Sequence, residues 1–217
     1  MSFRPGARQF FERRGAPTPP LPYDAEVDYI ESTGTQWIDT GIPCRPGLSA
    51  TGRFAESATA FSVNNWCFAN GRVSNTNQFG LYGASSGIYR YFAMTSVQSG
   101  GNVPRDNGWH EVIIDTTPFA RYVSIDGNVV YSNSSGGDVD VGSSIVLYAN
   151  YSHTSFGLSR ISSFSIKDTD TNQPLIDLIP VRFTNEQGMS EGAMYDRVSG
   201  ALFRNAGTGA FIWAEKQ

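Results

Sequence analysis

Three acidic residues near the start of the chain have a spacing that could support glycoside hydrolysis. Glu26, Asp28 and Glu31 follow the pattern E-x-D-x-x-E. Residues two apart in a strand point to the same face, so Glu26 and Asp28 could act together, and Glu31 would join them across a β-bulge. Two carboxylates about 5–5.5 Å apart suit a retaining mechanism. The alternative is that all three are solvated charges on a strand.

A group of aromatic residues in the middle of the chain could bind sugars. Aromatic rings stack on the C–H faces of sugars, and nearby asparagines can bind hydroxyl groups in a largely preformed pocket. The alternative is that half or more of these rings belong to the core. The candidate glycan-binding residues are Trp66, Tyr82, Tyr89, Tyr91, Tyr148 and Tyr151, with Asn64, Asn65, Asn70 and Asn77 as polar partners.

The histidines and cysteines do not form a pattern for metal binding or nucleophilic catalysis. His110 and His153 are far apart, and a zinc site needs more ligands than these and two cysteines provide. There is no phosphate-binding loop. Cys44 and Cys67 are expected to be buried free thiols, since free cysteine packs as a small core residue; the alternative is a disulfide across neighbouring strands, whose geometry the sequence does not fix.

One acidic pair in a glycine-rich stretch has a weak resemblance to a calcium loop. Asp138 and Asp140 follow two glycines. Calcium takes six to eight oxygen ligands at roughly 2.3–2.6 Å, and two aspartates do not supply them. We therefore predict no cofactor, no metal ligands and no catalytic residues, with calcium binding left open.

The composition favours a β-rich globular domain. The chain has 217 residues, of which 17% are charged and 13% aromatic, and it contains 23 glycines. This profile argues against a helical bundle, a coiled coil and a disordered chain. The net charge of −4 does not favour nucleic acid, because phosphate binding needs a basic face. No run of 18 apolar residues is present, so membrane insertion is not expected.

The chain divides into a tail, a spacer and a body. Residues 1–14 carry a local net charge of +3, and residues 15–22 contain four prolines, which favour a stiff extended spacer. The body covers residues 23–217. Apolar and basic side chains in the tail suit docking into a partner, although the tail could also fold back onto its own domain. The predicted anchoring residues are Phe3, Arg4, Arg8, Phe10, Phe11, Arg13 and Arg14.

The body has the pattern of many short strands separated by turns. Asp126-Gly127 is a strong signal for a two-residue hairpin. Pro180 lies inside an apolar run and predicts an edge strand or a bend. No segment has helical periodicity over 12 residues, so a sandwich or jelly roll is predicted. The predicted strands are 27–30, 36–40, 48–54, 60–68, 79–82, 88–94, 111–115, 120–125, 128–131, 144–148, 161–167, 175–183, 194–196, 202–204 and 211–213.

Two central segments carry a resemblance to a known fold. Residues 109–112 (WHEV) and 122–130 (YVSIDGNVV) resemble the central hairpin of concanavalin A-like and laminin-G-like jelly rolls. Residues 161–168 (ISSFSIKD) resemble the last strand of that family. The resemblance covers roughly residues 26–170. It implies an all-β fold, a concanavalin A-like jelly-roll sandwich of two antiparallel sheets, preceded by the extended N-terminal anchor.

Motifs at the two ends of the body carry a second resemblance. Residues 29–42 (YIESTGTQWIDTGI), 178–181 (LIPV) and 192–211 (GAMYDRVSGALFRNAGTGAF) are similar to a jelly-roll module of bacteriophage particle proteins and related prophage or gut-bacterial surface proteins. That family has structural and glycan-binding members. The motifs could equally be folding elements. Their turn glycines would then be Gly34, Gly207 and Gly209, and their core aromatics Trp37, Tyr195 and Phe203.

These resemblances imply a non-enzymatic bacteriophage virion protein, either a capsid decoration or a head or tail appendage. The expected partners are other virion proteins (capsid, portal, collar or tail), bound through residues 1–22, further copies of the chain, and a host or mucosal glycan. The alternatives are a carbohydrate-binding module of a bacterial surface protein and a β-glucanase. The β-glucanases share this fold but carry their acidic signature in mid-chain, whereas here it begins at Glu26.

Overall fold

The computed structural model describes most of the body and little of the tail and spacer. The described residues are 20–57, 59–60, 64–74, 77–95, 103–118, 120–134 and 141–216. The predicted anchor, residues 3–14, and the pair Asp138 and Asp140 lie outside them. The described part contains no α-helix. It likewise has no helix with the length and apolar character needed to cross a membrane.

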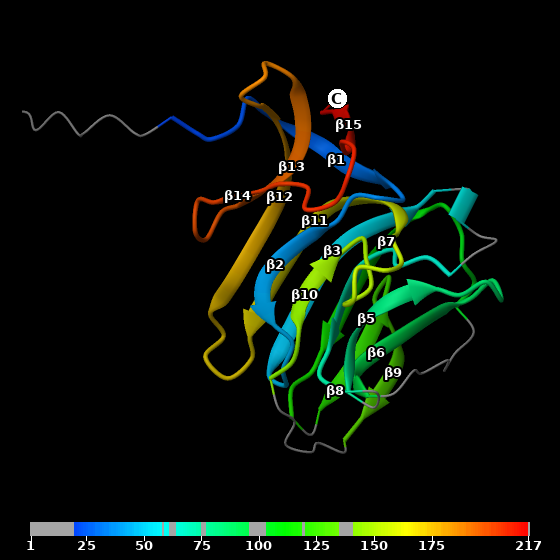
Figure 1. The fold of residues 1–217 in the computed structure, drawn as a ribbon. Helices are drawn as coiled ribbons and strands as arrows, with labels where there is room; N and C mark the ends of the chain where they lie inside the picture. Colours follow the sequence, from blue (N-terminus) through cyan, green and yellow to red (C-terminus); the bar gives the residue numbers. More distant parts are fainter. Residues whose placement is uncertain are drawn as a thin grey trace, which may run out of the picture.

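The strands of the described residues form two antiparallel sheets (Figure 1). Their bounds are β1 Ala25–Thr33, β2 Ile38–Pro43, β3 Leu48–Glu56, β4 Ala69–Arg72, β5 Gln78–Gly83, β6 Tyr89–Thr95, β7 Trp109–Asp115, β8 Arg121–Ile125, β9 Asn128–Asn133, β10 Ser144–Leu147, β11 Leu158–Asp168, β12 Pro174–Thr184, β13 Ser190–Asp196, β14 Leu202–Phe203 and β15 Ile212–Glu215. The larger sheet has the order β14-β13-β12-β1-β11-β3-β7-β8-β9, with β15 on β1, and the smaller has the order β2-β10-β4-β5-β6. The predicted fold class, an all-β jelly-roll sandwich, is confirmed.

The core lies between the sheets and is built from alternate residues of facing strands. In β3, Phe54 points inward and is buried, whereas Thr51 and Arg53 point to solvent. The Phe54 ring lies 5.6 Å from the ring of Phe68, which lies 5.4 Å from that of Phe164. Burying one such side chain contributes about 1.5–3 kcal/mol, so period-two alternation determines which face of each strand turns inward.

Both cysteines belong to this core, as predicted. Cys44 and Cys67 are free and fully buried. The Cys44 sulfur lies 3.7 Å from the sulfur of Met94. Burial raises the pKa of the Cys44 thiol to about 12, because the thiolate would lose its hydration.

The hairpin between β8 and β9 is also confirmed. Asp126 and Gly127 have φ angles of 51° and 76°. Two consecutive residues with positive φ make a turn whose twist matches the flanking strands. Asp126 stabilises this hairpin further, because its Oδ1 accepts a hydrogen bond of 2.9 Å from the backbone nitrogen of Glu111.

The strand predicted at 60–68 is wrong. No strand is assigned to the described residues of this segment, and β4 begins only at Ala69. Asn65 forms an isolated bridge with Gly83, and the backbone nitrogen of Cys67 donates back to Asn65 O over 2.9 Å. That short turn prevents an extended ladder, although the apolar residues on either side made the segment resemble a strand.

Pro180 is not on an edge strand, contrary to one of its two predicted positions. β12 pairs with β13 along one side, where Pro180 is opposite Met194. On its other side β12 pairs with β11 up to Leu178 and with β1 from Val181. Pro180 therefore lies where β12 changes its neighbour, a position at which a missing N–H breaks no regular ladder.

The two end motifs of the body lie against each other. The backbone nitrogen of Thr208 donates to Thr35 O over 3.2 Å, and Thr35 Oγ1 donates to Thr208 O over 2.8 Å. The nitrogen of Ala206 donates to Trp37 O over 2.9 Å. A Cβ atom at Gly207 would lie 2.0 Å from Thr35 O, so only glycine permits this approach. The motifs therefore have a folding role, joining the start of the body to its end.

The individual residues of these motifs agree with that interpretation. Gly34 and Gly209 have φ angles of 106° and 73° and are turn glycines, whereas Gly207 is required by close packing. Trp37 and Phe203 are partly buried against the main core. Tyr195 packs on a second, smaller apolar cluster. That cluster consists of Val181, Phe183 and Ala193, covered by Tyr23, Ile179, Tyr195 and Leu202.

Candidate functional site

Three of the six predicted glycan-binding residues belong to the core instead. Tyr89, Tyr91 and Tyr148 are at most 1% exposed. Their hydroxyl groups donate to backbone carbonyls, Tyr91 to Val130 O over 2.7 Å and Tyr148 to Ile30 O over 2.8 Å. Both of these bonds join the smaller sheet and its loops to the larger sheet. These tyrosines therefore cannot reach a ligand, and that part of the prediction is wrong.

The other three residues come together on the outer face of the smaller sheet. The rings of Trp66 and Tyr82 are stacked, with centroids 4.7 Å apart and planes 30° apart. Phe92 continues the stack, 5.8 Å from Tyr82 and 6.4 Å from Trp66. Tyr151 lines the same depression, of about 370 Å³, which we call the aromatic hollow. Its lining residues are Asn64, Trp66, Arg72, Gln78, Tyr82, Phe92, Asn150, Tyr151 and Ser155.

Strand alternation places these rings outward. In β6, Tyr89 and Tyr91 point inward, so Arg90 and Phe92 face the other side. Tyr82 of β5 is directly opposite Arg90 and shares that outer face. The run IYRYFAM has aromatic residues on both faces, so its sequence does not show which rings are inside.

Trp66 is held by the residue that precedes it. The Asn65 side chain is fully buried and donates to Glu56 Oε1 over 2.9 Å. Its Oδ1 accepts a hydrogen bond of 2.5 Å from the nitrogen of Leu158. Main-chain bonds to Gly83 fix the same residue to the end of β5. Asn65 was predicted as a sugar ligand, but it positions the backbone beneath the indole ring of Trp66.

Tyr151 is held by a second buried asparagine. Asn70 Oδ1 accepts a hydrogen bond of 2.7 Å from the backbone nitrogen of Tyr151, and Asn70 is fully buried. The Arg72 guanidinium lies over the Tyr151 ring, 4.5 Å from its centroid, and Nη1 also donates to the Tyr151 hydroxyl. Of the predicted asparagines, Asn64 lines the hollow, whereas Asn77 lies in the turn before β5. Arg72 was missed because it is a single charged residue at a strand end.

The aromatic hollow combines a ring surface with unused hydrogen-bonding groups. The indole N–H of Trp66 and the hydroxyl of Tyr82 make no hydrogen bond with any described residue. Arg72 retains further N–H groups beside the rings. A concave site that combines aromatic rings with placed polar side chains suits a polar small ligand, and the volume of about 370 Å³ lies near the lower end of the usual range of roughly 300–1,000 Å³.

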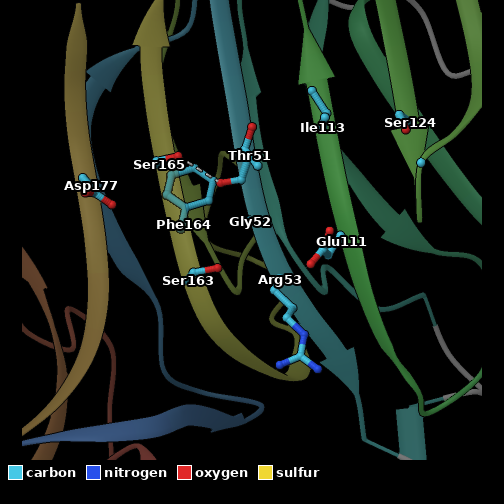
Figure 2. A pocket seen from close by; sticks show the side chains of 11 residues that line it. Thr51, Gly52, Arg53, Glu111, Ile113, Ser124, Ser163, Phe164, Ser165 and Asp177 are labelled. Carbon is cyan, nitrogen blue, oxygen red and sulfur yellow. Dashed lines mark hydrogen bonds between the residues drawn. The ribbon is translucent and has the colours of Figure 1, made fainter.

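A second depression lies on the outer face of the larger sheet (Figure 2). We call it the serine groove, of about 300 Å³, and its floor is formed by hydroxyl-bearing residues of β3 and β11, with Arg53 and Glu111 at one end. Its one ring, Phe164, is only 1% exposed, so the groove offers no surface for stacking. The lining residues are Thr51, Gly52, Arg53, Glu111, Ile113, Ser124, Gly127, Ser163, Phe164, Ser165 and Asp177.

The acidic triplet at the start of β1 lines neither depression. Glu26 pairs with Lys216, and hydrogen bonding from that lysine lowers the pKa of the Glu26 carboxyl. The register of β1 with β15 shifts between Val27 and Tyr29, so the strand does have a bulge. Glu31 is opposite Arg160 of β11. These residues occupy strand positions of β1 outside both depressions.

The two histidines, His110 and His153, make contacts that connect parts of the fold. His110 Nδ1 lies 2.7 Å from Asp126 Oδ2, and its Nε2 lies 3.0 Å from Asp106 Oδ1, so the ring links a loop to the β8–β9 hairpin. His153 stacks on Trp37 with ring centroids 3.8 Å apart. Within the described ranges no cluster of three or more histidine, cysteine or acidic side chains is placed to hold a metal ion.

Comparison with known proteins finds similarity to solved structures at low sequence identity. No protein-family model matches the chain, and no curated protein matches it significantly. Among solved structures, the mouse laminin alpha1 chain, domains LG4-5, aligns with a TM-score of 0.49 and 12% identity, over 96% of this chain and 83% of that chain. This degree of similarity carries no information about ligand or activity.

Proposed function

We propose that this protein is a non-enzymatic saccharide-binding module and that the aromatic hollow is its binding site. The stacked pair Trp66 and Tyr82, whose ring polar groups form no hydrogen bond with a described residue, is the observation that carries the proposal. A sugar ring places its C–H face on an aromatic ring and its hydroxyl groups on donors around the rim. Arg72 and Asn64 lie at the positions where such donors and acceptors are needed.

Preformation of the hollow supports the same proposal. Asn65 and Asn70 are fully buried and fix the backbone on which Trp66 and Tyr151 stand. A site held in its binding shape avoids part of the ordering cost of association. Saccharides are polar and gain little per contact, so a rigid site favours measurable affinity.

Substitution of Trp66 tests the site directly. The full chain is screened against an array of neutral and acidic oligosaccharides, and the best binder is titrated by calorimetry. We expect Trp66→Ala to weaken binding at least tenfold. The matched control is Trp109→Ala, which removes an indole ring from the outer face of the larger sheet, where Trp109 packs on Tyr29. Equal affinity in the wild type and Trp66→Ala, or no saccharide bound at all, would contradict the proposal.

We also propose that the module is displayed on a bacteriophage particle, held there by residues 1–22. Support comes from the basic, aromatic tail and from the resemblance of the end motifs to phage particle proteins. The place where the chain enters the body agrees with attachment through residues 1–22. Tyr23 packs on Tyr195 of β13. In Figure 1, β13 lies at one end of the larger sheet, away from β5 and β6 of the smaller sheet. The hollow is lined by residues of that smaller sheet and its loops. An anchor at that end would leave the hollow uncovered.

Removal of residues 1–22 tests the display. The truncated chain should unfold at the same temperature as the full chain, keep its saccharide affinity and fail to join particles in an assembly assay. Incorporation of the truncated chain would refute the anchor. Saccharide binding by a full chain that never joins particles would instead favour a bacterial surface module.

A further inference from the structure

We infer that the saccharide recognised by the aromatic hollow is acidic, carrying a carboxylate or sulfate group. This inference rests on the proposed function and specifies its ligand class. It is carried by the distribution of charge around the hollow, together with two arginines that form no ion pair with a carboxylate of the described residues.

The segments that build the hollow contain no acidic residue. Residues 57–105, which include β4, β5 and β6, have three arginines and no aspartate or glutamate. Residues 141–167, which include the loop that carries Asn150 and Tyr151, are also free of acidic residues. The whole chain has a net charge of −4, so this absence is local. An otherwise acidic protein repels anions, and a neutral-to-basic patch is where an anion can approach.

Arg72 is the first of the two cations. It lines the hollow, and no carboxylate of the described residues forms an ion pair with it. Its contacts with Tyr151 hold the guanidinium in one orientation without neutralising its charge. A guanidinium presents a rigid fork of N–H donors that matches the geometry of a carboxylate or sulfate.

Arg90 is the second. It is directly opposite Tyr82 and on the same face of β6 as Phe92, so it borders the stacked rings. Its Nε is buried and has no hydrogen-bond partner among the described residues. Arg105, the third arginine of the same stretch, differs because Glu56 neutralises it within the protein. Arg90 does not line the hollow itself, so its charge adds to the positive potential beside the rings without touching the ligand.

Acidic groups near this face are few and already engaged. Asp39 of β2 is separated from β4 by the intervening strand β10, and its carboxylate accepts hydrogen bonds from Ser144 Oγ and Gly41 N. Asp138 and Asp140 lie outside the described residues. Among the described residues, no carboxylate competes for Arg72.

Matched ligand pairs test the inference. The full chain is titrated with sialyllactose against lactose, with a glucuronate disaccharide against its glucose counterpart, and with 6-sulfated galactose against galactose. At least one acidic member should bind about tenfold or more tightly than its neutral counterpart. Raising the salt from 50 to 500 mM should reduce this preference, because salt screens exposed charges. The carboxylate and sulfate pairs show which anion is preferred.

Arginine variants assign the preference to the hollow. Arg72→Gln should lower affinity for the acidic ligand about tenfold and affinity for the neutral counterpart by much less, so the acidic preference should shrink, and Arg72→Lys should restore part of that preference. Arg90→Gln should act in the same direction. The matched control is Arg53→Gln, since Arg53 also stacks on an aromatic ring, Trp109, but on the other sheet.

The outcomes separate this inference from the proposed function. If Trp66→Ala abolishes binding but acidic and neutral ligands bind equally, the hollow binds saccharides and the inference is wrong. If the acidic preference is present but persists in Arg72→Gln and Arg90→Gln, the inference is wrong as well. If none of the six probes and no array member binds, the proposed saccharide binding is itself wrong, and the inference about its ligand is wrong with it.

Discussion

The Glu56 carboxylate and the Arg105 guanidinium form an ion pair sealed from solvent. Arg105 Nε lies 2.8 Å from Glu56 Oε2, and the side chains of Arg105 and Glu56 are 1% and 0% exposed. Arg105 also donates to Ala60 O and Ala84 O, over 2.8 and 2.7 Å. Glu56 accepts a hydrogen bond from Asn65, the residue before the indole of the aromatic hollow. One charged pair thus joins three loops and supports the site.

Removing one charge of this pair should destabilise the protein strongly. Glu56→Gln leaves the Arg105 charge buried without a counterion, and breaking a buried pair in this way costs about 3–5 kcal/mol. The free energy of unfolding is measured by urea denaturation. Glu215→Gln is the control, because Glu215 is 64% exposed in its pair with Arg182 and should change stability little. A similar small loss in both variants would mean that the buried pair contributes nothing.

The inter-sheet hydrogen bond of Tyr148 should be measurable by itself. Tyr148→Phe removes the hydroxyl that donates to Ile30 O over 2.8 Å and leaves that carbonyl without this buried donor. We expect a loss of about 1–3 kcal/mol in urea denaturation. Tyr82→Phe is the matched control, since its hydroxyl has no partner among the described residues, and it should stay within about 0.5 kcal/mol of wild type. Equal effects would contradict the assignment of Tyr148 to the core.

The contact between the end motifs should depend on Gly207. In Gly207→Ala the new methyl group would lie 2.0 Å from Thr35 O, so one of the two segments must shift. Such overpacking typically costs about 1–3 kcal/mol. The measurement is the thermal midpoint together with proteolysis near residue 207. Wild-type stability in this variant would show that the two motifs do not depend on each other.

Stability should fall in acid partly through Asp196. Burial acts to raise the pKa of this carboxyl, but hydrogen bonds from Ser199 and from the backbone nitrogens of Asp177, Val198 and Ser199 outweigh it and lower the pKa. A lowered pKa in the folded state stabilises the fold above the unfolded-state value of about 3.9, and this contribution is lost as pH falls through the folded-state pKa.

The variant Asp196→Asn isolates that contribution. It should be less stable than wild type at pH 7. The difference should shrink as pH falls from about 4 through the lowered folded-state pKa, because the carboxyl of Asp196 is protonated first in the unfolded state and then in the folded state. Urea denaturation at pH 7, 4 and 2.5 measures it. A constant difference at all three values would mean that the charge on Asp196 has no role.

Much of the fold could be predicted because alternation and turn chemistry are local. The hairpin at Asp126-Gly127 and the burial of Cys44 and Cys67 needed no knowledge of distant residues. The error at 60–68 has a different origin. There, the side chain of Asn65 and its contacts with Leu158 override the local preference for a strand.

The site could be predicted only in part, because the sequence does not show whether an aromatic side chain lies on the inner or the outer face of its strand. Trp66, Tyr82 and Tyr151 were predicted as glycan-binding residues and line one hollow, whereas Tyr89 and Tyr91 lie on the opposite face of a strand that is aromatic on both sides. Arg72 lacks a motif of its own. The signal that could have found it is the acid-free stretch around it, which is visible in the sequence.

The pairing of β1 with β15 sets the order in which the domain can be completed. Ile30 pairs with Ile161 of β11 and with Trp213 of β15. During synthesis at about 5–20 residues per second, β1 therefore waits on the order of ten to forty seconds for its last neighbour. Throughout that interval an open strand edge can pair with another nascent chain. Translation of this protein thus has a period of exposure to self-association, which ends when residues 212–215 leave the ribosome.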